Sequence, residues 1–472
     1  MPPTPPPTPE PGEPRTRDRG DACPGALRLH SADDGRLARL RLPGGRLTAH
    51  QVKVLAAAAE RLGDGRLSIT SRGNAELRGL ADGCGAELAA LLAEAGLLPS
   101  PTHERVRNIV ASPASGLDGL GASDVQLWAR ELDTRLLSAP WAAALSGRFL
   151  FVLDDGRGDV AGLGGDVTLV AVGGGEAELH VGGRAVRLAA SDAPSAALAV
   201  AGGFLAAAAA AGTGAWRVRE LPREYGVDPA DCGVTGEPVP APVLPQGPPP
   251  APGVLGPAAL SVLAPLGRLT AARLRALLPA DEVRLTPWRG VVVAGTDPGR
   301  LPLLDAAGLI TRPDSPWAGI TACTGRPGCA KSLADVRADA TPGPAGGSGP
   351  GPVAGSGPGP VAGSGPGPVA GSGPGPVAGS GPGPVAGSGP GAGQRRPSPS
   401  DHATRPASPP GPAGPTPPVL PVHYSGCERR CGHPHGDWTD VLATAGGDYL
   451  VDGVPTPRTA LPEAVTAART TR

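Results

Sequence analysis

Lysine is almost absent from this sequence. Of its 42 basic residues, only Lys53 and Lys331 are lysines and the rest are arginines, a bias that GC-rich coding alone would also produce. The formal net charge is −1, so no excess charge draws the chain toward nucleic acid or a membrane surface. Arginine keeps its charge and binds carboxylates through paired hydrogen bonds, so these cations suit carboxylate ligands.

Aromatic residues and long apolar runs are also scarce. Aromatics make up 3% of a chain that is 40% hydrophobic, so the core must consist mainly of Leu, Val and Ala. The first residues lack the apolar stretch of a signal peptide, and the alanine run at 206–211 is too short for a membrane span. We therefore expect a cytoplasmic protein without membrane or nucleic-acid partners. Its seven cysteines then indicate metal binding or catalysis over disulfides.

Three segments have the composition of unstructured chain. The octapeptide GSGPGPVA repeats five times over residues 347–386, inside a Gly/Pro-rich region at 341–418. Such a segment has too little apolar surface to offset chain entropy, so we predict a disordered insert there. We also predict a disordered tail at residues 1–19 and a linker in the Pro-rich stretch at 238–253.

Two distant segments share one pattern. Residues 26–80 and 259–295 each contain Gly-Arg-Leu-Thr, then a helix, then a strand that ends in Thr. In the first copy, Thr48 and Gln51 form a capping-box pattern ahead of an apolar helix face. Arg72 and Arg289 follow the two Thr-ending strands. The repeat predicts two pseudo-symmetric halves whose equivalent strand ends face one central site.

Four cysteines form two spaced pairs. Cys323 and Cys329 have five residues between them, and Cys427 and Cys431 have three. Thiolates are the usual ligands of a 4Fe-4S cluster, and glycines beside them let backbone N–H groups reach the sulfur atoms. Structural zinc fits the second spacing but not the first. The alternative interpretations of these four cysteines are a disulfide bond or unrelated free thiols. The remaining cysteines have no motif partner and read as structural: Cys23, Cys84 and Cys232.

These features resemble the nitrite and sulfite reductase superfamily. The matching segments are the cysteine pairs and residues 23–25, 39–45, 70–74 with Gly79, 107–109, 285–290 and 425–427. The resemblance covers about 20–340 and 420–455. It implies an α+β fold of duplicated ferredoxin-like half-domains plus a duplicated α/β 4Fe-4S domain, with pseudo-two-fold symmetry and the disordered insert.

The resemblance also implies domain boundaries. They are a tail at 1–19, a ferredoxin-like half-domain at 20–85, a reductase-like domain at 86–237, a linker at 238–253, a second half-domain at 254–312, a cluster domain at 313–340 and 419–458, the insert at 341–418, and a tail at 459–472.

The resemblance assigns roles to single residues. Cys323, Cys329, Cys427 and Cys431 match the cluster ligands, and Cys431 matches the one that also meets the haem iron in sirohaem reductases. Arg72 matches the arginine of a Thr-x-Arg motif that meets the tetrapyrrole, and Arg107 lies where the family places another. The other candidates for contact with a tetrapyrrole are Asn74, Arg78, Arg105 and Arg289. The sequence identifies no catalytic residue.

One departure separates members of the superfamily. The reductases carry two lysines that hold and protonate the inorganic anion, but Glu224 and Gly226 stand at those positions here. An acidic residue repels an anion, so the residues favour the precorrin-3B synthase branch over nitrite or sulfite reduction. That branch implies hydroxylation of precorrin-3A by dioxygen, followed by γ-lactone formation. An iron-sulfur electron carrier or sensor is a further alternative.

The resemblance implies cofactors and partners as well. Beyond the 4Fe-4S cluster, the synthase branch implies a second, mononuclear non-haem iron, and the reductase alternative implies sirohaem. The sequence does not identify the ligands of the second iron. Candidates near the last cysteine pair are His423, His433 and His435, with Asp437 close by, and His30 lies on a strand expected near the N-terminus. Expected partners are a tetrapyrrole substrate, dioxygen and an external electron donor.

Overall fold

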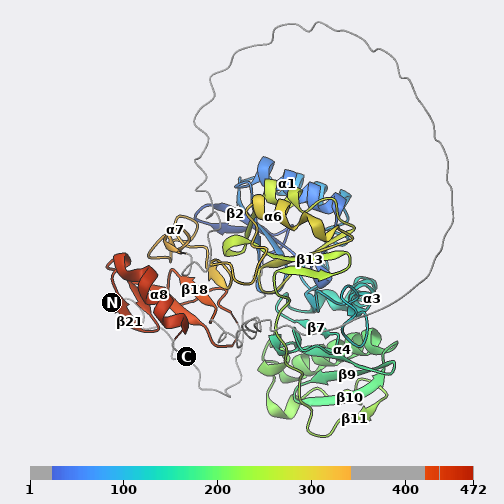
Figure 1. Ribbon diagram of the computed structural model, residues 1–472. Coiled ribbons are helices and arrows are strands. Elements are labelled where there is room, and N and C mark those ends of the chain that lie inside the picture. The colour runs from blue at the N-terminus through green and yellow to red at the C-terminus, as the bar shows by residue number, and fades with distance from the viewer. Residues whose placement is uncertain (1–23, 342–419, 435, 471–472) are drawn as a thin grey trace, which may run out of the picture. The chain divides into compact units, whose positions relative to one another are not determined.

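The computed structural model describes residues 24–341, 420–434 and 436–470 (Figure 1). The predicted tail at 1–19, nearly all of the predicted insert, Cys23 and His435 lie outside the described residues.

Two five-stranded antiparallel sheets repeat one design. The first has the order β1-β2-β5-β4-β14 and the second the order β12-β13-β16-β15-β3. The first consists of β1 (His30–Ala32), β2 (Gly35–Leu40), β4 (Arg66–Ile69), β5 (Ala75–Leu80) and β14 (Arg268–Thr270), with helices α1 (Ala49–Leu62) and α2 (Gly85–Glu94). The second consists of β12 (Gly253–Gly256), β13 (Ala259–Leu263), β15 (Glu282–Leu285), β16 (Gly290–Ala294) and β3 (Arg46–Thr48), with helices α5 (Ala271–Ala276) and α6 (Leu301–Ala306).

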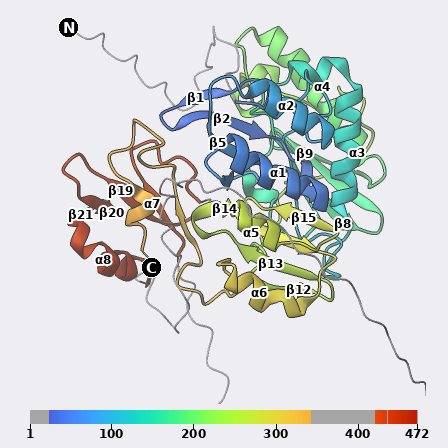
Figure 2. The ribbon, with the colours of Figure 1, turned by 90° about the horizontal axis from the view of Figure 1, so that it is seen from above.

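Each of these sheets takes its last strand from the other half. Strand β3 pairs with β15 and places Leu47 opposite Val283, while β14 pairs with β4 and places Leu269 opposite Leu67. All four side chains are fully buried in one hydrophobic core that both halves share. Helices α1 and α5 pack against each other beside this exchange (Figure 2). The two Gly-Arg-Leu-Thr segments of the sequence are therefore the strands that join the halves.

Helix α1 begins as the sequence predicts. The Gln51 backbone N–H donates to Thr48 Oγ1 at 3.2 Å, and the Thr48 backbone N–H donates to Gln51 Oε1 at 3.0 Å. This capping box satisfies two N–H groups that the first turn leaves without helical partners. The apolar side chains behind it are buried against the sheet: Val52, Leu55, Ala56 and Ala59.

Two further sheets repeat a mixed design in which two parallel pairings are followed by antiparallel ones. The first consists of β6 (Ile109–Ala111), β7 (Phe151–Asp154), β8 (Val167–Gly173), β9 (Glu176–Val181), β10 (Arg184–Ala189) and β11 (Glu237–Pro238), with helices α3 (Val125–Ser138) and α4 (Ala193–Ala211). The second consists of β17 (Ile320–Ala322), β18 (Val422–Ser425), β19 (Thr439–Ala443), β20 (Tyr449–Val451) and β21 (Val454–Thr456), with helices α7 (Val336–Asp339) and α8 (Leu461–Thr470). Duplicated half-domains together with a duplicated α/β unit confirm the predicted fold class. The exact domain boundaries stay a prediction.

Helix α4 contains the alanine run at 206–211, which is by itself too short for a membrane span, but the helix is longer than that run. Its 19 residues are enough, by length and composition alone, to cross a membrane. The helix packs on β8, β9 and α3, and its buried side chains include Val200 and Phe204. Core packing accounts for its apolar composition, since a buried helix of a globular domain has the same character.

The exchanged strands give a first prediction. Leu269→Ala removes a side chain with no exposed surface from the shared core, and it should lower the free energy of unfolding by about 2–5 kcal/mol. Leu303→Ala, at a position that is 65% exposed, is the control and should change it by less than about 0.5 kcal/mol. Urea denaturation followed by circular dichroism measures both. Equal midpoints for the two variants would contradict a stabilising role for the exchange.

Candidate functional site

Adjacent parallel strands bring the two cysteine pairs together. Cys323 directly follows β17, and Cys427 follows β18 after Gly426. The strands pair in parallel, and the Cys323 backbone N–H donates to the Tyr424 carbonyl at 2.9 Å. The carboxyl ends of parallel neighbours lie at one sheet edge, so both cysteine loops emerge there. The long stretch of chain between the pairs therefore does not separate them in space.

The four thiols form a donor set that suits an iron-sulfur cluster. All are free, and the Gly426 backbone N–H donates to Cys323 Sγ at 3.2 Å, the type of contact that tunes cluster potentials. Burial raises the pKa of the Cys431 thiol, and the nearby Cys323, Cys427 and Cys329 raise it further.

The spacing of the sulfur atoms favours a cluster over zinc. Among the described residues, no three of these cysteines have sulfur atoms within 4.8 Å of one another. Four sulfur ligands about 2.3 Å from one zinc ion would lie closer together than that.

Three arginines hold the cysteine loops by their main chain. Arg337 donates to the carbonyls of Ala322 and Thr324, on either side of Cys323, at 3.4 and 3.3 Å. Arg289 donates to the Gly432 carbonyl, next to Cys431, at 2.7 Å. Arg78 donates to the Gly328 carbonyl, next to Cys329, at 2.8 Å. Arg78 and Arg289 come from the two ferredoxin-like halves, so each half contacts one cysteine loop.

A cavity of about 760 Å³ opens beside the cysteines. Its lining comes from β2, β4 with the turn after it, β5, the turn that follows β15, the first α/β unit and the cysteine loops. The lining residues are Arg39, Arg41, Ser68, Ile69, Thr70, Ser71, Arg72, Glu76, Gly147, Arg148, Arg217, Arg219, Glu220, Gly267, Arg289, Ala322, Cys323, Thr324, Arg337, Cys431, Gly432 and His433. A cavity of this size is in the range of small-molecule and cofactor sites. Equivalent strand ends of the two halves therefore do meet at one site.

The predicted tetrapyrrole contacts divide into two groups. Arg72 and Arg289 line the cavity. Arg107 instead makes a paired contact with Asp133 at 2.6 and 2.7 Å, and Arg78 makes one with Asp34 at 2.9 and 2.8 Å. These contacts support structural roles.

Asn74 and Arg105 also lie outside the cavity lining. Asn74 is buried, accepting from the Leu42 N–H and donating to Asn108. The Arg105 main-chain carbonyl accepts a hydrogen bond from Arg41.

Six cavity arginines were not predicted as site residues: Arg39, Arg41, Arg148, Arg217, Arg219 and Arg337. Arg39 and Arg41 lie in the 39–45 segment that carries the family resemblance, which was the available signal for them. Arg217 and Arg219 directly precede the segment that lacks the reductase lysines. Arg148 and Arg337 have no motif around them and could not be found from the sequence.

The cavity has more cations than anions. Arg39 pairs with Glu76 at 2.7 Å, and Arg217 pairs with Asp166. Arg148 instead lies over the Trp216 ring, 4.9 Å from its centroid. In the described part of the chain, no ion pair joins Arg289 or Arg337 to a carboxylate, and their hydrogen bonds end on main-chain carbonyls. A ligand with several negative charges would complement this lining.

The histidines near the last cysteine pair differ in environment. His433 lines the cavity and stacks on Trp438 with ring centroids 5.2 Å apart. His423 is fully buried with its Nδ1 2.8 Å from Thr321 Oγ1, and burial lowers its pKa to about 3. The Coulomb effect of Arg289 acts in the same direction. A neutral imidazole suits metal binding, but no three-ligand group of the described residues includes either histidine.

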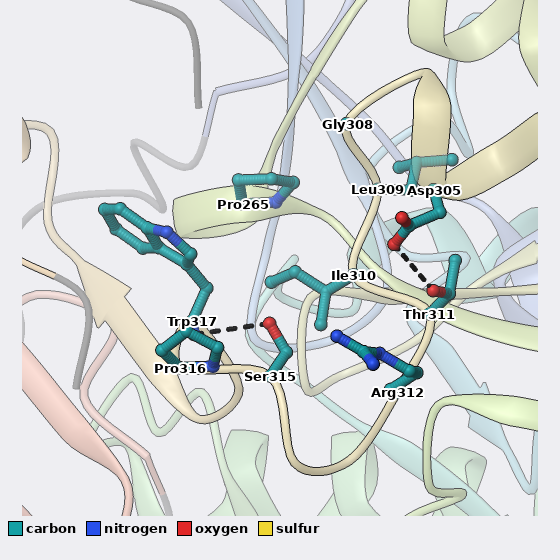
Figure 3. A pocket seen from close by; sticks show the side chains of 10 residues that line it. All are labelled: Pro265, Asp305, Gly308, Leu309, Ile310, Thr311, Arg312, Ser315, Pro316 and Trp317. Carbon is teal, nitrogen blue, oxygen red and sulfur yellow. Dashed lines mark hydrogen bonds between the residues drawn. The ribbon is translucent and has the colours of Figure 1, made fainter. Parts of the chain in front are cut away.

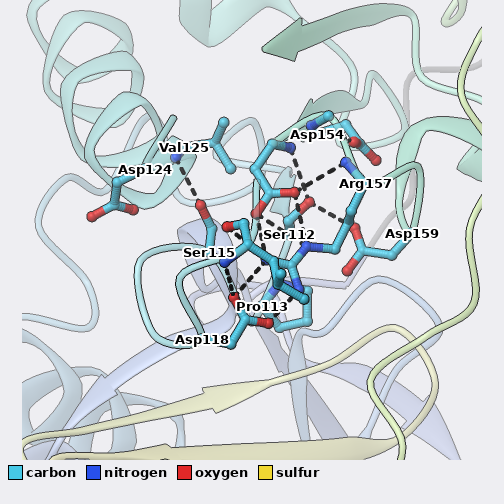
Figure 4. Close-up of polar contacts among 12 residues, drawn as sticks. Ser112, Pro113, Ser115, Asp118, Asp124, Val125, Asp154, Arg157 and Asp159 are labelled. Atoms are coloured by element: carbon cyan, nitrogen blue, oxygen red, sulfur yellow. Dashed lines mark hydrogen bonds and ion pairs between the residues drawn. The ribbon is translucent and has the colours of Figure 1, made fainter. Parts of the chain in front are cut away.

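The first α/β unit carries the equivalent of the cysteine loops with different chemistry. The Ser112 N–H donates to the Leu153 carbonyl as the Cys323 N–H does to Tyr424, so the strand register equates Ser112 with Cys323. In this unit the Arg157 guanidinium pairs with Asp118 at 2.7 Å (Figure 4). It also pairs with Asp155 at 2.7 Å. A buried ion-pair network therefore stands where the second unit has its thiols.

A smaller pocket lies between Pro265 and the 305–317 segment (Figure 3). It encloses about 50 Å³, which is far below the usual size of a ligand site. The large cavity beside the cysteines is therefore the better candidate site.

Comparisons with known proteins agree with this architecture. Residues 30–95 match the family described as the nitrite/sulfite reductase ferredoxin-like half domain. The NirA protein of Mycobacterium tuberculosis has a similar structure, with a TM-score of 0.52 and 22% identity over 64% of this chain and 62% of that one. Residues 30–95 therefore carry a nitrite/sulfite reductase ferredoxin-like half domain, and the described chain shares the fold of the NirA structure.

The curated relatives that the chain matches have two different activities. A precorrin-3B synthase of Sinorhizobium sp. is 32% identical over 155 residues, which is 33% of either chain. Ferredoxin–nitrite reductases of Leptolyngbya laminosa and Synechococcus elongatus are 40% identical over 82 residues and 36% over 105, covering 17% and 22% of this chain and 16% and 20% of theirs. The matches thus span at most about a third of these relatives.

The cysteine assignment gives a second prediction. Cys329→Ser should abolish retention of iron and acid-labile sulfide, because a hydroxyl is a poor substitute for a thiolate ligand. Cys232→Ser is the matched control, since this partly buried cysteine belongs to the first α/β core. Iron and sulfide assays on anaerobically purified protein measure the outcome. Full cluster content in Cys329→Ser would remove this cysteine from the ligand set.

The ion-pair network of the first α/β unit gives a third prediction. Asp159 is 6% exposed and accepts from Ser112 Oγ at 2.6 Å, and burial, with Asp154 and Asp155 nearby, raises its pKa to about 7. The folded protein therefore holds this proton more tightly than the unfolded chain, whose aspartate pKa is about 3.9. The stability that Asp159 contributes is complete in acid and declines as the pH rises to about 7.

Asp159→Asn removes this titration and should therefore gain stability relative to the wild type as the pH rises from about 4 to about 7. Asp314→Asn, whose side chain is 63% exposed, is the control and should show no such trend. Denaturation midpoints measured across this pH range test the expectation. Parallel curves for wild type and Asp159→Asn would contradict it.

Proposed function

We propose that the chain catalyses the oxygen-dependent hydroxylation and γ-lactone formation of precorrin-3A, the reaction of a precorrin-3B synthase. The observation that carries this proposal is the arginine-rich cavity of about 760 Å³, in which the hydrogen bonds of Arg289 and Arg337 within the described residues end on main-chain carbonyls beside the predicted cluster cysteines Cys323 and Cys431. A flexible macrocycle edged with acetate and propionate groups has the size and charge to fill it. The synthase relative from Sinorhizobium sp. adds support.

The cavity arginines and the four cysteines would have separate roles in this reaction. Arg72, Arg148 and Arg219, together with Arg289 and Arg337, would bind the peripheral carboxylates and fix the face of the macrocycle that meets the cysteine loops. The 4Fe-4S cluster, held by the four cysteines, would supply electrons one at a time, which triplet dioxygen requires. One oxygen atom enters the substrate and the other leaves as water, with two electrons from an external donor and two protons. The expected compartment is the cytoplasm, where thiols stay reduced.

A sirohaem-dependent nitrite or sulfite reductase is the second candidate, favoured by the two nitrite reductase relatives. The lining argues against it, because neither Lys53 nor Lys331 reaches the cavity and Glu224 is exposed outside it. Inorganic anions need positioned proton donors, and guanidinium groups do not release protons at neutral pH. An electron carrier would not need a cavity of this size.

A single preparation distinguishes these functions and supplies the fourth prediction. Protein purified without oxygen should contain iron and sulfide without stoichiometric sirohaem, and it should add one oxygen atom to precorrin-3A when oxygen and an electron donor are supplied. Mass spectrometry follows the product, and iron in excess of the cluster reports a mononuclear iron. Stoichiometric sirohaem with nitrite or sulfite reduction by viologen dye, and no change in precorrin-3A, would establish the reductase instead.

A matched pair of variants tests the role of the cavity. Arg219→Gln should raise the KM for precorrin-3A about tenfold at unchanged cluster content, the loss expected for one charge-assisted contact. Arg223→Gln is the control, because this exposed arginine lies four residues away and outside the lining.

A further inference from the structure

Arg337 lies beside Cys323 in the lining of the cavity. Its guanidinium donates to the carbonyls on both sides of that cysteine and to the Leu266 carbonyl at 3.0 Å. Because every one of these acceptors is a neutral carbonyl, the full positive charge of Arg337 acts on the thiolate on one side and on any cavity ligand on the other.

Arg289 holds the equivalent position at Cys431. It donates to the Gly432 carbonyl at 2.7 Å and lines the same cavity. Its backbone has φ of 61°, a conformation that non-glycine residues rarely adopt, which indicates that the surrounding structure fixes this side chain in place. Two cations, one from the β15–β16 turn and one from helix α7, thus each lie beside one predicted cluster cysteine and the cavity.

Both arginines are charged at neutral pH. Burial lowers the pKa of Arg289 to about 10 and that of Arg337 to about 9, with the Cys323 thiolate opposing the shift in each case. Even these lowered values leave the guanidinium protonated, and arginine resists deprotonation in proteins.

We propose that Arg289 and Arg337 couple the binding of a polycarboxylate in the cavity to the redox state of the cluster. A nearby cation stabilises the reduced cluster, which carries one more negative charge. A bound carboxylate screens that cation, so the ligand lowers the reduction potential and binds the oxidised form more tightly. The coupling is reciprocal by thermodynamic linkage. The step is a single electron from a low-potential donor to the cluster, with no bond or proton transferred.

The coupling takes the identity of its ligand, precorrin-3A, from the proposed function and rests on it for that point. A cluster whose potential falls when the substrate binds becomes a stronger reductant only in the occupied enzyme. Electrons then pass to dioxygen when a substrate is present to be oxidised, and reduction of oxygen without substrate is limited.

The test measures the midpoint potential of the full-length, cluster-loaded protein. Dithionite titration without oxygen, followed by electron paramagnetic resonance, is run alone and with saturating mellitate, a colourless benzene hexacarboxylate, and then with precorrin-3A. Calorimetry on the oxidised protein measures mellitate binding. The expected result is about tenfold tighter binding to the oxidised form, which for one electron is a fall of about 59 mV.

Variants assign the effect to the two arginines. Arg337→Gln and Arg289→Gln should lower the potential of the free protein and shrink the ligand-induced shift, and Arg337→Lys should keep most of both. Arg469→Gln is the matched control: Arg469 is buried in the same α/β unit and its guanidinium donates to the Leu420 and Ala318 carbonyls, but it lies outside the cavity lining. It should behave as the wild type.

Three results would overturn the coupling: absence of mellitate binding, binding without a change in potential, or a full shift in the Arg289→Gln, Arg337→Gln double variant. The proposed function is judged separately, by turnover of precorrin-3A. A mellitate shift in a protein that leaves precorrin-3A unchanged would keep the coupling and remove the substrate assignment.

Discussion

The exchange of one short strand between the ferredoxin-like halves is the constraint on which the rest of the structure depends. Because β3 completes the second sheet and β14 completes the first, neither half supplies all five strands of its own sheet. The exchange buries Leu47 and Leu269 in a common core and fixes the relative position of the two Thr-ending strands. The residues that follow those strands, Arg72 and Arg289, therefore meet at one cavity.

A second constraint acts at the cysteine loops. Parallel pairing of β17 with β18 brings Cys323 and Cys427 to one sheet edge whatever length of chain connects the strands. Arginines from both halves then hold the loops through main-chain carbonyls. The placement of the thiols thus relies on hydrogen bonds from outside their own unit, which joins the cluster site to the cavity.

The sequence predicted those features whose signal is local or repeated. Each of these signals is a short stretch of sequence: the capping box at Thr48, the Gly-Arg-Leu-Thr segment of each repeat, and the spacing within each cysteine pair. The sequence could not predict which arginines line the cavity and which form structural ion pairs, because the partner of each arginine is distant in the sequence. Arg107 pairs with Asp133 and Arg78 with Asp34, whereas the hydrogen bonds of Arg337 within the described ranges end on carbonyls. In a chain with 40 arginines, nothing in the local sequence distinguishes these cases.

The ion-pair network of the first α/β unit has a consequence for how the protein is made. Its loops are closed by Arg157 with Asp118 and Asp155, groups that the polypeptide supplies itself. In the proposed cluster-loaded enzyme, the duplicate unit would instead close its loops on iron and sulfide that the cell must deliver. Assembly of one copy of the repeat would then depend on the iron supply, while the ion pairs of the other form from the chain alone.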